Sequence, residues 1–113
     1  MSATFVIDQA RNRQFYFTLH AASGETILKS ETYVTRASAL HGIASVRMNA
    51  RLNERYERKT DQRGAPFFSI KGGNNEVIGT SEPYKNETER DIAIESVKQD
   101  APDAVLVDHS KPL

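Results

Sequence analysis

The chain repeats itself with a period of 51 residues. When residues 15–50 are laid over residues 66–101 without a gap, ten of the 36 positions are identical. The identical pairs are Phe17/Phe68, Glu25/Glu76, Ile27/Ile78, Ser30/Ser81, Glu31/Glu82, Tyr33/Tyr84, Ile43/Ile94, Ser45/Ser96, Val46/Val97 and Ala50/Ala101. Identities at this density indicate a tandem duplication. Two copies are too few for a solenoid, so we expect the halves to pack on each other as the subunits of a symmetric dimer do.

Each repeat opens with short strands. The segment 14–21, "QFYFTLHA", alternates between Phe17 and Leu19 on one face and polar residues on the other, which predicts a strand with one buried face. A turn follows in which Gly24 is free to adopt a positive φ, and Asn75 takes its place in the second repeat. The returning strands are "TILKS" and "VIGTS". Further strands are expected at 4–8, 54–61 and 104–108.

A helix ends each repeat. Thr35 and Asn86 are the expected N-caps, because each stands before an apolar stripe of helical period. The stripe of the first helix comprises Ala39, Ile43, Val46 and Ala50, and that of the second comprises Ile94, Val97 and Ala101.

The predicted order is βββα βββα β, which is an α+β fold with antiparallel strands, helices packed on one face and a pseudo-twofold axis, as in a fused dimer. We expect one compact domain over residues 1–113, made of repeats at about 4–53 and 55–108. Because the duplication already supplies the second half of the dimer, the chain is expected to be a monomer.

Composition excludes several functions. The 15 basic and 15 acidic residues balance, although residues 1–65 carry +4 and residues 66–113 carry −4. There is no cysteine, the three histidines show no metal-ligand spacing, and no glycine-rich loop precedes a helix. We therefore expect no metal and no cofactor. No signal peptide or membrane span is recognisable, so we expect a cytoplasmic protein that does not contact membranes.

Both repeats share an aromatic strand, a Gly or Asn turn, a returning strand, Ser-Glu-x-Tyr, and a helix containing Ile-x-Ser-Val-Lys/Arg. This pattern, over roughly residues 4–108, resembles the YegP-like family of small bacterial proteins in its duplicated form. The resemblance implies the same fold and a fused dimer. It implies no particular activity, substrate or cofactor.

The Ser-Glu-x-Tyr tetrapeptides provide the first candidate binding residues: Ser30, Glu31 and Tyr33, with their copies Ser81, Glu82 and Tyr84. They could form a paired polar site, with the carboxylate as ligand and the ring as a stacking platform. The favoured interpretation is a structural corner in which the tyrosine packs on the first helical turn and the serine satisfies backbone donors.

A basic run provides the second set. Arg55, Arg58 and Lys59 lie near Tyr56 at the junction of the repeats. Basic residues interleaved with exposed aromatic rings bind single-stranded nucleic acid. The favoured interpretation is a solvated surface in which neighbouring glutamates balance the charge.

Three functions follow from these residues. The preferred one is a non-catalytic binding or interaction module with a protein partner. The alternative is a nucleic-acid binder that uses the basic first half. The third is an enzyme with a site at the pseudo-twofold axis built from Glu31 and Glu82; no repeated base accompanies the serines, so an enzyme is not favoured.

Overall fold

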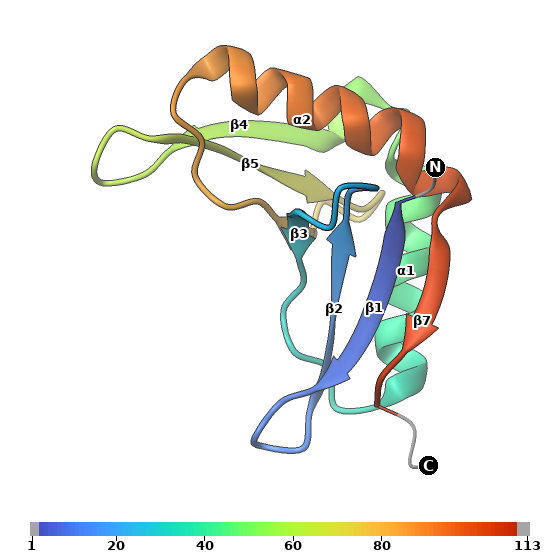
Figure 1. The fold of residues 1–113 in the computed structure, drawn as a ribbon. Coiled ribbons are helices and arrows are strands. Elements are labelled where there is room, and N and C mark those ends of the chain that lie inside the picture. The colour runs from blue at the N-terminus through green and yellow to red at the C-terminus, as the bar shows by residue number, and fades with distance from the viewer. Residues whose placement is uncertain (1–2, 111–113) are drawn as a thin grey trace.

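The computed structural model describes residues 3–110, which form one twisted seven-stranded sheet and two helices (Figure 1). The elements in chain order are β1 (Thr4–Gln9), β2 (Phe15–His20), β3 (Thr26–Lys29), α1 (Arg36–Asn49), β4 (Tyr56–Thr60), β5 (Pro66–Lys71), β6 (Val77–Thr80), α2 (Glu87–Asp100) and β7 (Val105–Asp108). Two short 3₁₀ turns, η1 (Asn53–Arg55) and η2 (Ala101–Asp103), follow the helices. The predicted α+β fold and its element order are confirmed.

The strand order in the sheet is β4-β5-β6-β3-β2-β1-β7. The two repeats meet where β3 pairs antiparallel with β6, through the register pair Lys29 and Thr80. These two residues are equivalent in the 51-residue repeat, so a pseudo-twofold axis passes between them. The last strand, β7, lies outside the symmetric six and pairs in parallel with β1.

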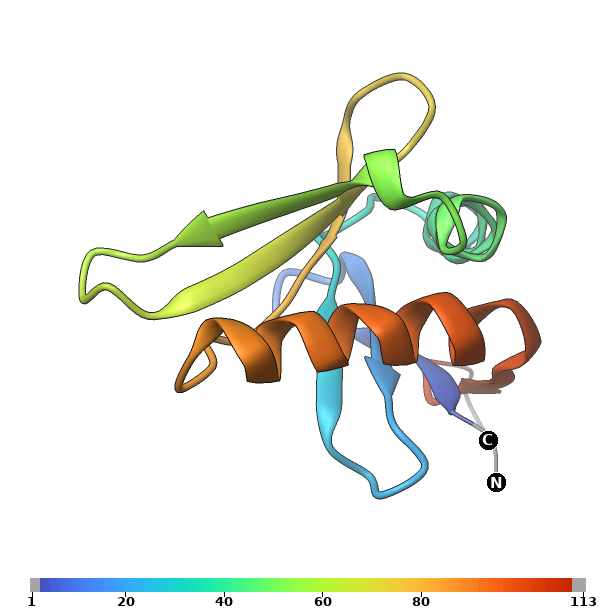
Figure 2. The same cartoon turned by 90° about the horizontal axis from the view of Figure 1, so that it is seen from above.

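The sheet bends sharply at this junction. Figure 1 shows β4 and β5 running across the direction of β1 and β2, and Figure 2 shows the same inclination from above. Strand pairing between the repeats is thin at the bend, because β3 and β6 share a single register pair. Other contacts must therefore hold the two halves together.

The hairpin turns follow the chemistry expected from the sequence. Gly24 has φ +92° and Asn75 has φ +69°, so both adopt the left-handed conformation predicted for them. Asparagine is one of the few residues other than glycine that enters this region readily. The same turn is thus built from different residues in the two repeats.

Both predicted N-caps are confirmed. The Thr35 side chain accepts a hydrogen bond from the Ser38 backbone N–H at 3.0 Å, and the Asn86 side chain accepts one from the Glu89 N–H at 2.8 Å. Each satisfies one of the four donors that a helix start leaves unpaired. The capping residues fix where each helix begins, directly after the Ser-Glu-x-Tyr corner.

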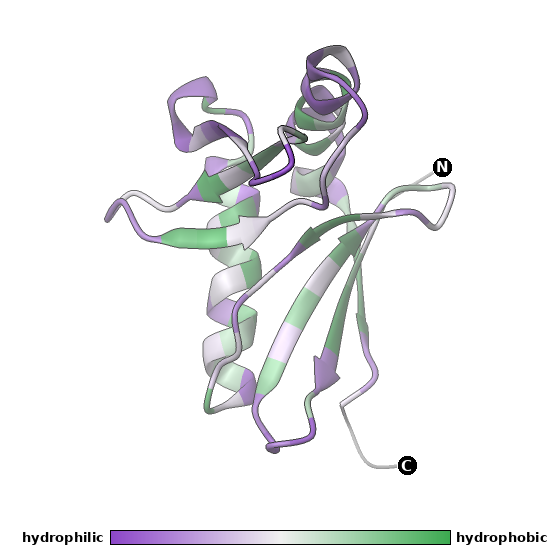
Figure 3. Ribbon diagram, turned by 90° about the vertical axis from the view of Figure 1, so that its left-hand side faces the viewer, coloured by the Kyte–Doolittle hydropathy of each residue, from purple (hydrophilic) through white to green (hydrophobic). Residues whose placement is uncertain are grey.

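Equivalent aromatic triads lie in the core of each repeat. Phe17 contacts Phe5 edge-on at a centroid distance of 6.0 Å and stacks on Tyr33 at 6.3 Å. In the second repeat Phe68 contacts Tyr56 at 6.0 Å and stacks on Tyr84 at 6.4 Å. Figure 3 shows the apolar residues concentrated on strands and helices and the polar ones on the connecting turns.

The core is shared between the repeats. Ile43 and Val46 of α1 and Ile94 and Val97 of α2 belong to one buried cluster. Helix α1 contacts β2 of its own repeat and also β5 and β6 of the other. Arg47 of α1 donates to the carbonyl oxygens of Ala101 and Pro102 in η2, at 3.3 and 3.2 Å. These contacts compensate for the thin strand pairing at the axis.

Among the residues that the structure describes, neither helix combines the length and the apolar character that crossing a bilayer requires.

Because one core serves both repeats, we predict that the whole chain unfolds in a single cooperative transition as a monomer. Residues 1–53 alone, about half of the core, are expected to be unfolded or to gain structure only by dimerising. Thermal unfolding followed by circular dichroism, together with light scattering over a concentration series, measures both properties. A fragment that is folded and monomeric at micromolar concentration, or two separated transitions in the whole chain, would contradict the shared-core interpretation.

Candidate functional site

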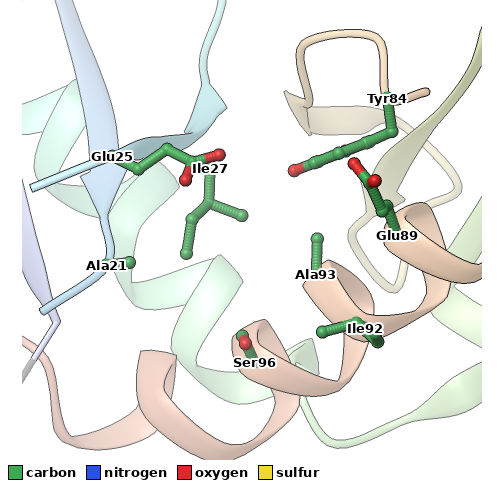
Figure 4. Close-up of a pocket in the computed structure, with 8 residues that line it drawn as sticks. All are labelled: Ala21, Glu25, Ile27, Tyr84, Glu89, Ile92, Ala93 and Ser96. Carbon is green, nitrogen blue, oxygen red and sulfur yellow. The ribbon is translucent and has the colours of Figure 1, made fainter. Parts of the chain in front are cut away.

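Two hollows occupy equivalent places in the two repeats. The Tyr84 pocket has a volume of about 250 Å³ and is lined by Ala21, Glu25, Ile27, Tyr84, Glu89, Ile92, Ala93 and Ser96 (Figure 4). The Tyr33 pocket has a volume of about 470 Å³ and is lined by Tyr33, Ala37, Ser38, His41, Gly42, Ser45, Asn74, Glu76 and Ile78. Both are open to solvent and combine one aromatic ring with carboxylate, hydroxyl and aliphatic groups.

Each pocket is assembled from both repeats. In the Tyr84 pocket, Glu25 and Ile27 come from the β2–β3 hairpin of the first repeat, whereas Tyr84 and Ser96 come from the second. In the Tyr33 pocket the origins are reversed, with Glu76 and Ile78 from the second repeat. Four of the ten identical residue pairs line these pockets: Glu25/Glu76, Ile27/Ile78, Tyr33/Tyr84 and Ser45/Ser96.

The backbone of each tyrosine is held by the first residue of β2 or β5. Tyr33 forms an isolated antiparallel bridge with Phe15, and its backbone N–H donates to the Phe15 carbonyl at 2.6 Å. The Tyr84 N–H donates to the Pro66 carbonyl at 2.7 Å in the same way. With the backbone fixed and one ring face stacked on a core phenylalanine, each tyrosine presents its hydroxyl end to the pocket.

Two carboxylates lie near each tyrosine. Burial, and after it the charges of Glu31 and Glu76, raise the pKa of Tyr33. Burial, and after it Glu25 and Glu82, raise the pKa of Tyr84. Both phenols therefore stay protonated at neutral pH and can donate a hydrogen bond. Figure 4 shows the Tyr84 hydroxyl directed across the opening towards Glu25 and Ile27.

The two pockets differ at one close contact with the helix. A Cβ placed on Gly42 would lie 2.5 Å from the Tyr33 hydroxyl and 2.8 Å from Phe17 Cε2. The absence of a side chain thus lets Tyr33 approach α1 in its second turn. Ala37 and Ser38 of the first turn, where the sequence predicts the contact, line the same pocket as Tyr33. The second repeat has Ala93 at this position, which lines the Tyr84 pocket.

The serines of the Ser-Glu-x-Tyr corners have a structural role. Buried Ser30 Oγ accepts a hydrogen bond from the Phe17 N–H at 2.9 Å and donates to the Glu31 carbonyl at 2.7 Å. Ser81 Oγ does the same with the Phe68 N–H at 3.0 Å and the Glu82 carbonyl at 2.9 Å. The donors they satisfy belong to β2 and β5, not to the helix starts, because each serine closes the hairpin ladder where its strand ends.

The glutamates of the corners come together at the pseudo-twofold axis. Glu31 and Glu82 line one hollow of about 260 Å³, together with residues of β3 and β6 that include Lys29 and Thr80. Both glutamates are exposed. The two glutamates of the hypothetical enzyme site therefore do lie in one hollow at the axis. The hydroxyl groups of Ser30 and Ser81 beside them, however, already donate to backbone carbonyls.

Each basic residue of the junction has a polar partner. Arg58 pairs with Asp91 at 3.0 Å and Lys59 with Glu57 at 3.2 Å. Arg55 donates through Nε to Asn49 Oδ1 at 2.8 Å. Tyr56 is buried and donates to the Ala50 carbonyl at 2.6 Å, so it offers no stacking surface. The aromatic ring within this run is therefore not available to stack on a base.

Within residues 3–110 no three His, Asp or Glu side chains are grouped as metal ligands would be.

Comparison with known proteins places this geometry in a family. The family model of a domain of unknown function, DUF1508, matches the chain twice, at residues 10–57 and 61–108. The chain belongs to the DUF1508 family. The two matches begin 51 residues apart, which is the period read from the sequence.

Full-length relatives confirm the resemblance to YegP-like proteins. A UPF0339 protein of Acinetobacter baylyi is 45% identical over 96% of this chain and 97% of its own length. The YegP protein of Escherichia coli O157:H7 is 41% identical over 97% and 100%. The solution structure of E. coli yegP, a protein of unknown function, has a TM-score of 0.92 at 39% identity and covers 100% of this chain and 97% of its own.

Sequence reasoning identified only part of what the DUF1508 repeats assemble. Tyr33 and Tyr84 were candidates, but Glu25, Ser45 and their copies were not assigned to a site. Their identity in both repeats was the available signal. It could not show that the hairpin of one repeat faces the helix of the other, because that contact joins residues about 60 positions apart.

Replacing Ser30 by alanine is expected to destabilise the fold by roughly 1–3 kcal/mol, because the buried Phe17 N–H loses the Oγ acceptor that it has in the structure. Ser81→Ala should cost a similar amount through Phe68. The exposed Ser23 offers a matched control, and Ser23→Ala should change the free energy of unfolding by less than about 0.5 kcal/mol. Urea denaturation of the three variants measures the difference, and equal stabilities would exclude the structural role.

Gly42→Ala is expected to lower the free energy of unfolding by about 1 kcal/mol. Helix propensity alone would stabilise the variant by about 1 kcal/mol, but the new methyl group would overlap the Tyr33 hydroxyl and Phe17. Adding Tyr33→Phe, which removes the hydroxyl oxygen, should restore part of the loss. Thermal denaturation measures all three proteins, and a melting temperature raised by Gly42→Ala would show that Tyr33 moves away without cost.

Proposed function

We propose that this DUF1508 protein is a non-catalytic binding module, with the Tyr33 and Tyr84 pockets as two equivalent ligand sites. The observation that carries the proposal is the convergence of four repeat-identical residue pairs on both pockets. Ser30 and Ser81 account for another identical pair through backbone hydrogen bonds, and the core residues account for others. The exposed Glu25 and Glu76 have no such structural explanation.

Binding is favoured over catalysis by the state of the polar groups. The phenols of Tyr33 and Tyr84 have raised pKa values, so neither is a base near neutral pH. The Ser30 and Ser81 hydroxyls donate to carbonyls and are buried, so neither is available as a nucleophile. What remains in each pocket is a set of groups that can hold a ligand by hydrogen bonds, charge and stacking.

The ligand that fits best is a cationic group, such as a lysine or arginine side chain of a partner protein. Each tyrosine has two nearby carboxylates, and no Lys or Arg is among the residues that line either pocket. In the described part of the chain, Glu25, Glu76, Glu31 and Glu82 form no ion pair. A cation beside a half-buried aromatic ring and unpaired carboxylates gains both electrostatic and cation–π attraction.

Size supports a side chain over a large cofactor. The volumes of about 250 and 470 Å³ lie near the lower end of the range for small-molecule sites. Because each pocket needs residues from both repeats, the duplication keeps both sites intact within one chain. A partner with two basic residues could then occupy both pockets and gain affinity through effective concentration.

The proposal is tested by titrating the protein with a synthetic Lys/Arg-rich peptide and, separately, with a peptide of the same length in which Glu replaces the basic residues. NMR chemical shifts of the Tyr33 and Tyr84 rings report the site. We expect saturable shifts with the basic peptide only, weakening as salt screens the carboxylates. Glu25→Gln combined with Glu76→Gln should weaken binding at least tenfold, which is about 1.4 kcal/mol.

Glu54→Gln combined with Glu87→Gln is the matched control, because it changes net charge equally at exposed positions outside both pockets. It should leave the affinity within about twofold. If both double variants lost the same affinity for the basic peptide, the loss would come from the change in net charge. That result would contradict binding in the tyrosine pockets. Binding of single-stranded DNA that is lost on Arg55→Glu with Arg58→Glu, without binding of the basic peptide, would favour the nucleic-acid function instead.

A further inference from the structure

Helix α1 presents an apolar stripe to solvent on the side away from the core. Leu40, Ala44 and Met48 recur every four residues along the helix, and Leu52 continues the series just beyond it. All four are exposed, Met48 to 80% and the two leucines to 38% each. The buried face of α1 is formed by other residues, including Ile43 and Val46.

The second repeat shows that the fold does not need this stripe. At the equivalent positions it has Asp91, Glu95, Gln99 and Asp103. Helix α2 has the same length as α1, begins with an equivalent cap and buries the equivalent residues Ile94 and Val97. The second repeat thus folds with charged and polar side chains at these positions. The fold therefore does not require leucine or methionine at the equivalent positions of the first repeat.

The stripe borders a groove that is larger than either tyrosine pocket. It has a volume of about 730 Å³ and is lined by Leu40, His41, Ala44, Ser45, Met48, Asn49, Leu52, Arg55 and Gly73. Gly73, in the β5–β6 turn, faces Arg55 across it, since a Cβ there would lie 3.9 Å from Arg55 Nη2. The helical part of the stripe, from Leu40 to Met48, spans roughly 12 Å, or a little over two turns, and Leu52 extends it beyond the helix end.

The lining of the groove contains a positive charge and no negative one. Helix α1 contains no acidic residue, and no Asp or Glu lines the groove. Arg55 lines the groove, and the exposed Arg51 directly precedes the lining residue Leu52 in the chain. Neither arginine forms an ion pair with any residue between 3 and 110. A second copy docking through the same face would bring these arginines together, which is unfavourable. The complementary occupant is apolar and acidic.

We propose that this groove binds an acidic amphipathic helix of a partner protein, about three turns long. Its apolar side chains would pack on Leu40, Met48 and Leu52, and its carboxylates would face Arg55. Helices bind grooves through such anchors at successive turns, and the flexible methionine side chain adapts to different partners. The groove adjoins the Tyr33 pocket, with which it shares His41 and Ser45, but its own lining contains Arg55 and no carboxylate, so it selects the opposite charge.

The test uses a fluorescein-labelled synthetic helix of 18 residues with Leu on one face and Glu on the other, and the same peptide with Lys in place of Glu. Fluorescence anisotropy with the full chain measures affinity, and the NMR signal of the Met48 methyl group reports the place. The acidic peptide should bind saturably and shift this signal. The Lys peptide should bind at least tenfold more weakly.

The decisive variant is Leu40→Asp with Met48→Gln, which copies Asp91 and Gln99 of the second repeat and should therefore keep the fold. It should bind the acidic peptide at least tenfold more weakly at an unchanged melting temperature. Val34→Lys is the matched control, because it replaces a 76% exposed apolar residue outside the groove by the residue of the other repeat, Lys85. It should retain the affinity.

Three results would overturn the proposal. The first is the absence of saturable binding of the acidic peptide up to millimolar concentration, and the second is equal binding by the Leu40→Asp/Met48→Gln variant. The third is sedimentation of the unliganded chain as a dimer that this variant abolishes, because a second copy would then be the occupant of the groove.

Discussion

Burial of the two helices against a sheet that neither repeat completes alone is the interaction on which the rest of this structure depends. The apolar stripes of α1 and α2 enter one core, and α1 reaches strands of both repeats. Strand pairing cannot provide this cohesion, since β3 and β6 share only the pair Lys29 and Thr80. The burial of apolar side chains therefore contributes most to holding the two repeats together. The same packing places each hairpin opposite the helix of the other repeat.

The two pockets form because each hairpin lies opposite the helix of the other repeat. Because the β2–β3 hairpin faces α2, and the β5–β6 hairpin faces α1, each tyrosine meets a glutamate from the other repeat. Tyr33 and Glu25 belong to the same repeat but line different pockets. Duplication thus accounts for two sites, and it also allows the repeats to differ where the fold is indifferent, as Met48 and Gln99 do on the outer faces of the helices.

Internal comparison within the chain separates structural from functional residues. Where both repeats keep a residue and its contacts are in the backbone or the core, as for Ser30 and Phe17, the fold explains it. Where both keep an exposed residue at a pocket, as for Glu25, a ligand explains it better. Where one repeat has an exposed apolar residue and the other a charge, as for Leu40 and Asp91, the fold explains the charge through its ion pair with Arg58 but gives no reason for the exposed leucine.

The sequence by itself determined the elements of this protein: the caps Thr35 and Asn86, the left-handed turn at Gly24 and Asn75, and the apolar stripes all act over a few residues, where propensity and hydrogen bonding are local. It also revealed the duplication. Only the tertiary structure decided the strand order, the parallel pairing of β7 with β1 and the meeting of Glu25 with Tyr84. These depend on how two similar units pack, because the same local patterns are compatible with packing within a repeat or across the axis.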